Sequence, residues 1–204
     1  MTRLDWGNLP KNYERGVDRG VLYFPVNEYA AWDGLISVQE QTQQSKGAPR
    51  WFDGVVYSID QDIADFSARI DAYTYPYMLE DHILALHTGQ TLSATAYETS
   101  PFGFTYRTER LDGYKIHLVY NIIATMDAIS HSTLDSDINL KPFSFTFHTT
   151  PIDFPNARPT SHVYIDTTIA TKEHVFELEK ILYGSEESYP RFPQPTELLT
   201  LFNS

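Results

Sequence analysis

The chain has 204 residues, with 27 Asp and Glu against 15 Lys and Arg, so its formal net charge is −12. No basic cluster stands out, which argues against ordinary nucleic-acid binding, because that activity places grouped Lys and Arg against phosphates. The absence of Cys excludes disulfides, thiolate metal sites and Cys nucleophiles. Hydrophobic residues make up 42% of the chain and argue against disorder, and the length suits a single domain over residues 1–204.

Neither a secretory signal nor a membrane span is expected. The first residues lack a basic start followed by an apolar core. No apolar run approaches the roughly 20 residues that cross a bilayer. We therefore expect a soluble protein that is made in a cytoplasm and has no membrane partner.

Alternation of apolar and polar residues predicts a series of half-buried strands. In chain order they lie at residues 34–40, 53–59, 65–74, 102–110, 114–124, 143–148 and 163–167. The clearest pair is 102–110 with 114–124, because the short connector between them contains Asp112-Gly113, a usual hairpin turn. One face of the second strand is expected to carry Tyr114, Ile116, Leu118, Tyr120 and Ile122.

Helical patterns are confined to the end of the chain. A helix is predicted over about residues 171–183, with Thr171 as its N-cap and Gly184 as its stop. Its apolar face is expected to carry Val175, Leu178 and Leu182. A second, short helix is expected after Pro195. The fold class that follows is mainly β or α+β, a β-sandwich or barrel flanked by one helix in the C-terminal half.

Two further segments are less regular. Residues 39–50 are a long polar connector with too little apolar content to pack on their own domain. Long connectors of this kind are uncommon unless they have a function, so we expect this one to reach an adjacent subunit. Residues 82–98 fit neither the helical nor the strand period.

No residue pattern for catalysis, a cofactor or a metal is found. The seven His include no His-Glu-x-x-His spacing, and His117 and His148 fall on the polar-looking faces of their strands, so all seven are interpreted as surface or hydrogen-bonded imidazoles. The acidic segment 60–65 lacks the Gly and the Glu of a calcium loop. There is no Gly-x-Ser-x-Gly elbow and no phosphate-binding Gly loop. We therefore expect a protein that is not an enzyme.

Several pieces of the chain, taken in order, are similar to one known family. They are residues 13–23, Trp32-Asp33-Gly34 with 35–38, Phe52-Asp53-Gly54 with 55–57, 66–68, 72–76, Pro101-Phe102-Gly103-Phe104 with 105–108, 113–121 and Ile181-Leu182-Tyr183-Gly184. Together they resemble the major tail proteins, or tail-tube subunits, of siphovirus-like phages of actinobacteria. The resemblance covers most of the chain, from about Trp6 to Phe202.

This resemblance implies a structural virion protein with a single tail-tube domain. Its subunits would close into rings, hexameric in this family, and the rings would stack along the tape measure protein between the tail-end proteins. Assembly would take place in the host cytoplasm, and genomic DNA would later pass down the lumen without specific binding. The resemblance also implies a β-sandwich flanked by a helix, with a long loop that reaches a neighbouring subunit.

The resemblance implies that a few long strands from each subunit line the channel, and the candidates are those at 65–74 and 102–124. Their polar faces are mixed in charge, so acids on the connectors are needed for a lumen that repels DNA. Asp60, Asp62 and Asp65, beside the first of these strands, are the chosen lumen-facing acids. The alternative is that these three acids solvate an outer turn.

Two other functions remain open from the sequence. One is a distal tail or tail-completion protein of the same fold, which forms one ring instead of many. The other is a β-sandwich carbohydrate-binding module, with Trp32, Trp51 and the aromatic run 73–77 as platforms for sugar rings.

Overall fold

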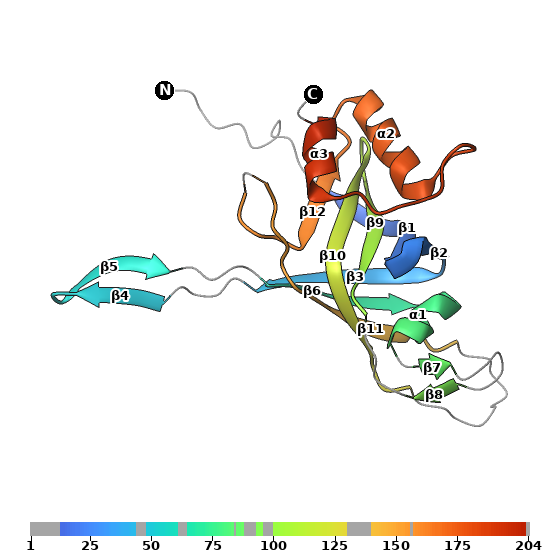
Figure 1. The fold of residues 1–204 in the computed structure, drawn as a ribbon, viewed down its shortest axis with the longest axis horizontal. Helices are drawn as coiled ribbons and strands as arrows, with labels where there is room; N and C mark the ends of the chain where they lie inside the picture. The colour runs from blue at the N-terminus through green and yellow to red at the C-terminus, as the bar shows by residue number, and fades with distance from the viewer. Residues whose placement is uncertain are drawn as a thin grey trace.

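In the computed structural model, the described residues are 13–43, 48–60, 65–83, 85–87, 93–95, 100–129, 140–155 and 157–202. They form an antiparallel β-sandwich with helices at its side (Figure 1), which confirms the expected fold class. The strands of the main sheet are β1 (Glu14–Phe24), β2 (Glu28–Trp32), β3 (Leu35–Gln43), β6 (Asp65–Ala72), β9 (Phe102–Arg110), β10 (Tyr114–Met126), β11 (Phe143–Thr149) and β12 (His162–Asp166).

The remaining elements lie around this sheet. The helices are α1 (Tyr77–Ile83), α2 (Lys172–Tyr183) and α3 (Pro195–Phe202), with a 3-10 turn at Pro25–Asn27. Two hairpins pair only within themselves: β4 (Ala48–Phe52) with β5 (Val55–Asp60), and β7 (Ala85–His87) with β8 (Ser93–Thr95). The described residues within 82–98, a segment that fitted neither period, therefore belong to the end of α1 and to a small hairpin.

Strand β10 joins the two layers of the sandwich. The sheet order is β2-β1-β9-β10-β11-β6-β3, and β12 pairs with the first half of β10. Residues 115–119 of β10 pair with β12, whereas residues 122–126 pair with β11. The first half of β10 thus belongs to one layer, and its second half belongs to the other.

A bulge at Asn121 makes this change of layer possible. The register between β9 and β10 shifts between Val119 and Ile122, and Asn121 has φ 52, a left-handed value that Asn tolerates better than most residues. Ile116 and Leu118 therefore face the helices, whereas Ile122 faces the sandwich interior. The expected placement of Ile122 beside Ile116 and Leu118 was wrong, because one extra residue reverses the alternation.

Two hydrophobic clusters result. The inner core lies between the layers and contains Leu22, Phe24, Trp32, Phe66, Ala68, Ile70, Ala72, Leu79, Ile83, Phe102, Phe104, Tyr106, Val119, Ile122, Ala124, Phe145 and Phe147. The helix-side core lies under α2 and α3 and contains Val21, Tyr23, Ile116, Leu118, Tyr120, Ile165, Val175, Leu178, Leu182 and Leu198. The first half of β10 is consequently buried on both faces.

Helix α2 closes the helix-side core as its sequence predicts. Leu178 and Leu182 are fully buried, and Tyr23 donates its hydroxyl to the backbone oxygen of Leu182 at 2.7 Å. Gly184 ends the helix with φ 80, and its N–H donates to the oxygen of Lys180. Thr171 takes the N-cap position with extended backbone, but its side chain makes no capping hydrogen bond. The short helix after Pro195 is also confirmed.

Residues 39–50 are not one long connector, as was predicted, whereas their expected reach to an adjacent subunit or ring stays a prediction. Strand β3 continues to Gln43 and pairs with β6 along that length, as in the pairs Gln39 with Arg69 and Gln41 with Ser67. Strand β4 begins at Ala48, and residues 44–47 lie outside the described residues. Backbone pairing needs no apolar side chain on a solvent-facing side, so a polar sequence can continue a strand.

Candidate functional site

The hairpin β4–β5, called here the arm, extends away from the sandwich (Figure 1). Asp53 and Gly54 form its two-residue turn with φ values of 47 and 77. Positive φ at both positions is typical of the turn that matches the twist of a hairpin. The alternation placed both residues inside a strand, which was wrong, because β5 begins at Val55.

Large apolar side chains of the arm face solvent. Trp51 is 65% exposed, Phe52 70%, Val55 68% and Tyr57 83%. A single two-stranded hairpin is marginally stable in water without a face to pack on, and clustered exposed apolar side chains mark contact surfaces. The arm therefore has the composition of an element that packs against a second molecule.

Of the three acids that were predicted to face a lumen, Asp60 and Asp65 have described backbone positions at the root of the arm. The backbone of Asp60 ends β5 and the backbone of Asp65 begins β6. Asp62 lies outside the described residues, as do the side-chain positions of Asp60 and Asp65. Their role in facing a channel remains a prediction.

One layer of the sandwich has an open, polar outer face. It is built from the residues of β3, β6, β11 and the end of β10 that alternate with the inner core. These residues are Ser37, Gln39, Gln41, Ser67, Arg69, Asp71, Ser144, Thr146, His148, Ile123 and Thr125. In the chain, the arm lies between β3, at the free edge of this layer, and its neighbour β6.

The other candidate channel strands are covered. On β9, Thr105 is fully buried, and Arg107 is held between Asp18 of β1 and Glu179 of α2. The helix-side core lies against the same face of β9 and β10. Within one chain, Thr105 and Arg107 of β9 are therefore covered, whereas Ser67, Arg69 and Asp71 of β6 lie on the open face.

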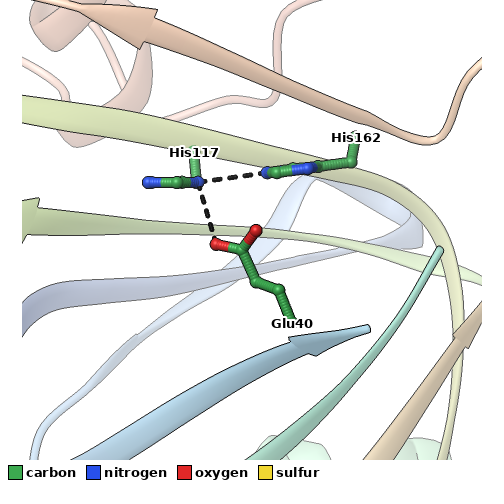
Figure 2. A group of neighbouring side chains, drawn as sticks. All are labelled: Glu40, His117 and His162. Carbon is green, nitrogen blue, oxygen red and sulfur yellow. Dashed lines mark hydrogen bonds and ion pairs between the residues drawn. The ribbon is translucent and has the colours of Figure 1, made fainter. Parts of the chain in front are cut away.

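A carboxylate and two imidazoles meet at one end of the inner core (Figure 2). Glu40 comes from β3, His117 from β10 and His162 from β12. Nδ1 of His117 lies 3.1 Å from Nε2 of His162 and 3.3 Å from Oε1 of Glu40. We call these three residues the His-Glu cluster.

Burial and hydrogen bonds hold the cluster in place. His117 is 3% exposed, and its Nε2 lies 3.0 Å from Oγ1 of Thr108. Tyr106 stacks on the His117 ring, with the ring centroids 4.5 Å apart, and donates its hydroxyl to Oε1 of Glu40 at 2.5 Å. Burial lowers the pKa of His117 to about 4, although Glu40 opposes the shift. Burial also lowers the pKa of His162, so both rings are neutral near pH 7.

Sequence reasoning missed this cluster and misplaced His117. The three residues come from strands that are far apart in the chain, so no linear spacing marks them. His117 lies on the inner face with Val119 rather than on a solvent face, and there its Nε2 lies beside Oγ1 of Thr108 and its Nδ1 beside Glu40. His148 is exposed, as its strand pattern predicts.

The aromatic platforms expected for a carbohydrate module are only partly available. Trp32 is 3% exposed and packs in the inner core against Phe104 and Phe145. Its Nε1 donates to the backbone oxygen of Thr74. Trp32 therefore has a packing role, and it cannot present its ring to a sugar.

No protein-family model matches this sequence, and no curated protein matches it. Among the described residues, no helix is long and apolar enough to cross a membrane.

Proposed function

We propose that this protein is the tail-tube subunit of a siphovirus-like phage. In this proposal the chain is a single tail-tube domain and a structural virion protein, and it is not an enzyme. Subunits close into hexameric rings, rings stack along the tape measure protein between the tail-end proteins, and the lumen carries the genome. The proposal rests on the family resemblance of the sequence, and two structural features support it.

The arm is the structural observation that supports the proposal most. Its Trp51, Phe52 and Tyr57 side chains are exposed, and the arm itself extends away from the sandwich (Figure 1). A second copy supplies a partner surface without requiring any other protein. Burying these side chains between copies would contribute roughly 25 cal/mol for each Å² of apolar surface removed from water.

The open polar face suits a channel wall. DNA carries one negative charge per about 1.7 Å of its axis, so a basic wall would hold it by counterion release. The open face carries one Arg, and Arg69 is paired with Asp71 and Asp127 at 3.6 and 3.2 Å. A wall of hydroxyls, amides and paired charges has little affinity for a passing duplex.

Substitution in the arm tests this function. The variant Trp51→Ser, Phe52→Ser, Tyr57→Ser should sediment as a folded monomer, whereas the parent sediments as large assemblies. The matched control is Leu111→Ser, Ile169→Ser, Tyr189→Ser, which removes exposed apolar side chains elsewhere and should assemble like the parent. A parent that stays monomeric, or an arm variant that assembles normally, contradicts the proposal.

A further inference from the structure

The His-Glu cluster brings three ligand atoms together at a single point of the sandwich. Nδ1 of His117, Nε2 of His162 and a carboxylate oxygen of Glu40 all lie within 4.8 Å of one another. Figure 2 shows Glu40 and His162 directed at the same nitrogen of His117. We propose that these three side chains form a binding site for a divalent transition-metal cation, and that Zn²⁺ fits it best.

The donor set selects the class of ion. Ca²⁺ and Mg²⁺ are bound by oxygen atoms, whereas two imidazole nitrogens with one carboxylate suit Zn²⁺ and its neighbours in the first transition row. Three protein ligands leave the fourth position of a tetrahedron for water.

The distances between ligand atoms fit such an ion. Zn²⁺ binds nitrogen and oxygen at about 2.0–2.1 Å, so two ligand atoms of a tetrahedral site lie about 3.3 Å apart. His117 Nδ1 is already 3.1 Å from His162 Nε2 and 3.3 Å from Glu40 Oε1. The third pair, His162 and Glu40, lies within 4.8 Å, so bringing these two ligand atoms closer and turning the lone pairs toward one point are the adjustments that remain.

The protonation states favour a cation as well. Neutral imidazole has one N–H and one lone pair, and metals bind the neutral form. When the proton of His117 is on Nε2, it donates to Thr108 Oγ1, and the lone pair on Nδ1 points toward Glu40 and His162. A carboxylate and an imidazole lone pair repel each other unless a proton or a metal ion lies between them.

Outer partners of the ligands are in place. Thr108 fixes the orientation of His117, and Tyr106 holds Glu40 by its hydroxyl. Metal-binding His and carboxylates almost always have such partners, which set the tautomer and orientation of the ligand.

A route for the ion leads in past Glu40. The Glu40 side chain is 34% exposed, whereas that of His117 is 4% exposed. A hollow of about 420 Å³ is lined by Glu40 and Thr108, with Glu14 and Ser37. Arg15 also lines this hollow, and Lys115 pairs with Glu14, so Glu40 is the carboxylate through which an ion reaches the buried imidazoles from solvent.

A bound ion would tie β3 to β10 and β12. Strand β3 is a neighbour of neither in the sheet order: it is at the free edge, whereas β12 pairs with the first half of β10. Strand β3 is also the strand that leads into the arm, so the ion would brace the root of the arm. The site itself does not depend on the proposed function.

Metal titration of the full-length, chelator-treated protein tests the site. Co²⁺ should produce visible absorption bands of tetrahedral geometry, which Zn²⁺ then removes by displacement, and Zn²⁺ should raise the melting temperature. Glu40→Gln and His162→Gln should each weaken metal binding at least about tenfold. Loss of a residue that only hydrogen-bonds to a metal ligand already weakens metal affinity by about that factor, and these substitutions remove a ligand itself. Glu40 is partly exposed, so Glu40→Gln is expected to fold, and circular dichroism checks this.

His148→Gln is the matched control, since His148 is an exposed imidazole on β11 outside the cluster. It should bind Co²⁺ and Zn²⁺ like the parent. The proposal is overturned if the parent gives no tetrahedral Co²⁺ spectrum, or if Glu40→Gln and His162→Gln bind both ions as tightly as the parent does.

Discussion

Arg107 and Asp18 form a two-pronged pair between β9 and β1. Nε of Arg107 donates to Oδ1 of Asp18 at 2.9 Å, and the terminal nitrogen donates to Oδ2 at 2.6 Å. The guanidinium also lies 4.4 Å from the centre of the Tyr114 ring and 3.7 Å from Glu179 on α2. One side chain thus connects two strands and the helix that covers them.

Arg107→Lys should destabilise the fold, because an ammonium cannot reproduce the planar, two-pronged contact. We expect a loss of about 1–2 kcal/mol in the free energy of unfolding, measured by urea denaturation. Arg15→Lys is the control, since Arg15 is 71% exposed and lies 4.0 Å from Glu109. It should change stability by less than about 0.5 kcal/mol. Equal effects of the two substitutions would refute the special role of Arg107.

Leu178→Asp tests the packing of α2. Leu178 is fully buried in the helix-side core, so a carboxylate there loses apolar contacts and has no partner. The expected cost is about 3–5 kcal/mol in thermal or urea unfolding. Phe176→Asp lies on the same helix but at a position that is 58% exposed, and it should cost less than about 1 kcal/mol. If Leu178→Asp unfolds like the parent, α2 does not close this core.

Asn121→Val tests the bulge that carries β10 between the layers. Asn121 has φ 52, a conformation that a β-branched residue rarely adopts, so we expect a loss of about 1–2 kcal/mol. Asn121→Gly keeps access to that conformation and should lose clearly less than Asn121→Val. Equal losses of stability for the two variants would show that Asn121 does not stabilise the fold through its left-handed backbone conformation.

Asp71 should make stability depend on pH in the acid range. The hydrogen bond from Ser144 lowers its pKa, with help from Ser37 and Arg69, although partial burial opposes the shift. Because the pKa is lower in the folded than in the unfolded protein, the stabilisation is full above the unfolded value near 3.8 and is lost as the pH falls through the folded value.

Asp71→Asn should therefore be less stable than the parent by about 1–2 kcal/mol at neutral pH, and the gap should shrink toward about pH 2. Asp112→Asn, in the exposed β9–β10 turn, is the control and should show a small gap at every pH. A gap for Asp71→Asn that stays constant or widens on acidification would contradict the pKa shift.

Much of the fold follows from local patterns. Phe66, Ala68, Ile70 and Ala72 alternate cleanly and share the inner core, as predicted. The buried positions of α2 were also predicted correctly, because the apolar face of a helix and the Gly that ends it can be recognised within a short stretch of sequence. These elements can be predicted without knowing which other elements they pack against.

The rest depends on three-dimensional neighbours. The bulge at Asn121 adds one residue to β10, which reverses the side of the sheet to which the following residues point. The polar part of β3 forms a strand because it pairs with β6. The His-Glu cluster arises from three strands that the fold alone brings together. The role of Asp60, Asp62 and Asp65 remains a prediction, because it concerns an assembly rather than one chain.

Negative-stain electron microscopy of the purified, full-length protein tests the central claim most directly. We predict hollow tubes built from stacked rings, with a central channel wide enough for duplex DNA. Isolated rings would instead favour the single-ring tail component of the same fold. Separate, unassembled particles at high protein concentration, with the arm intact, would contradict the account.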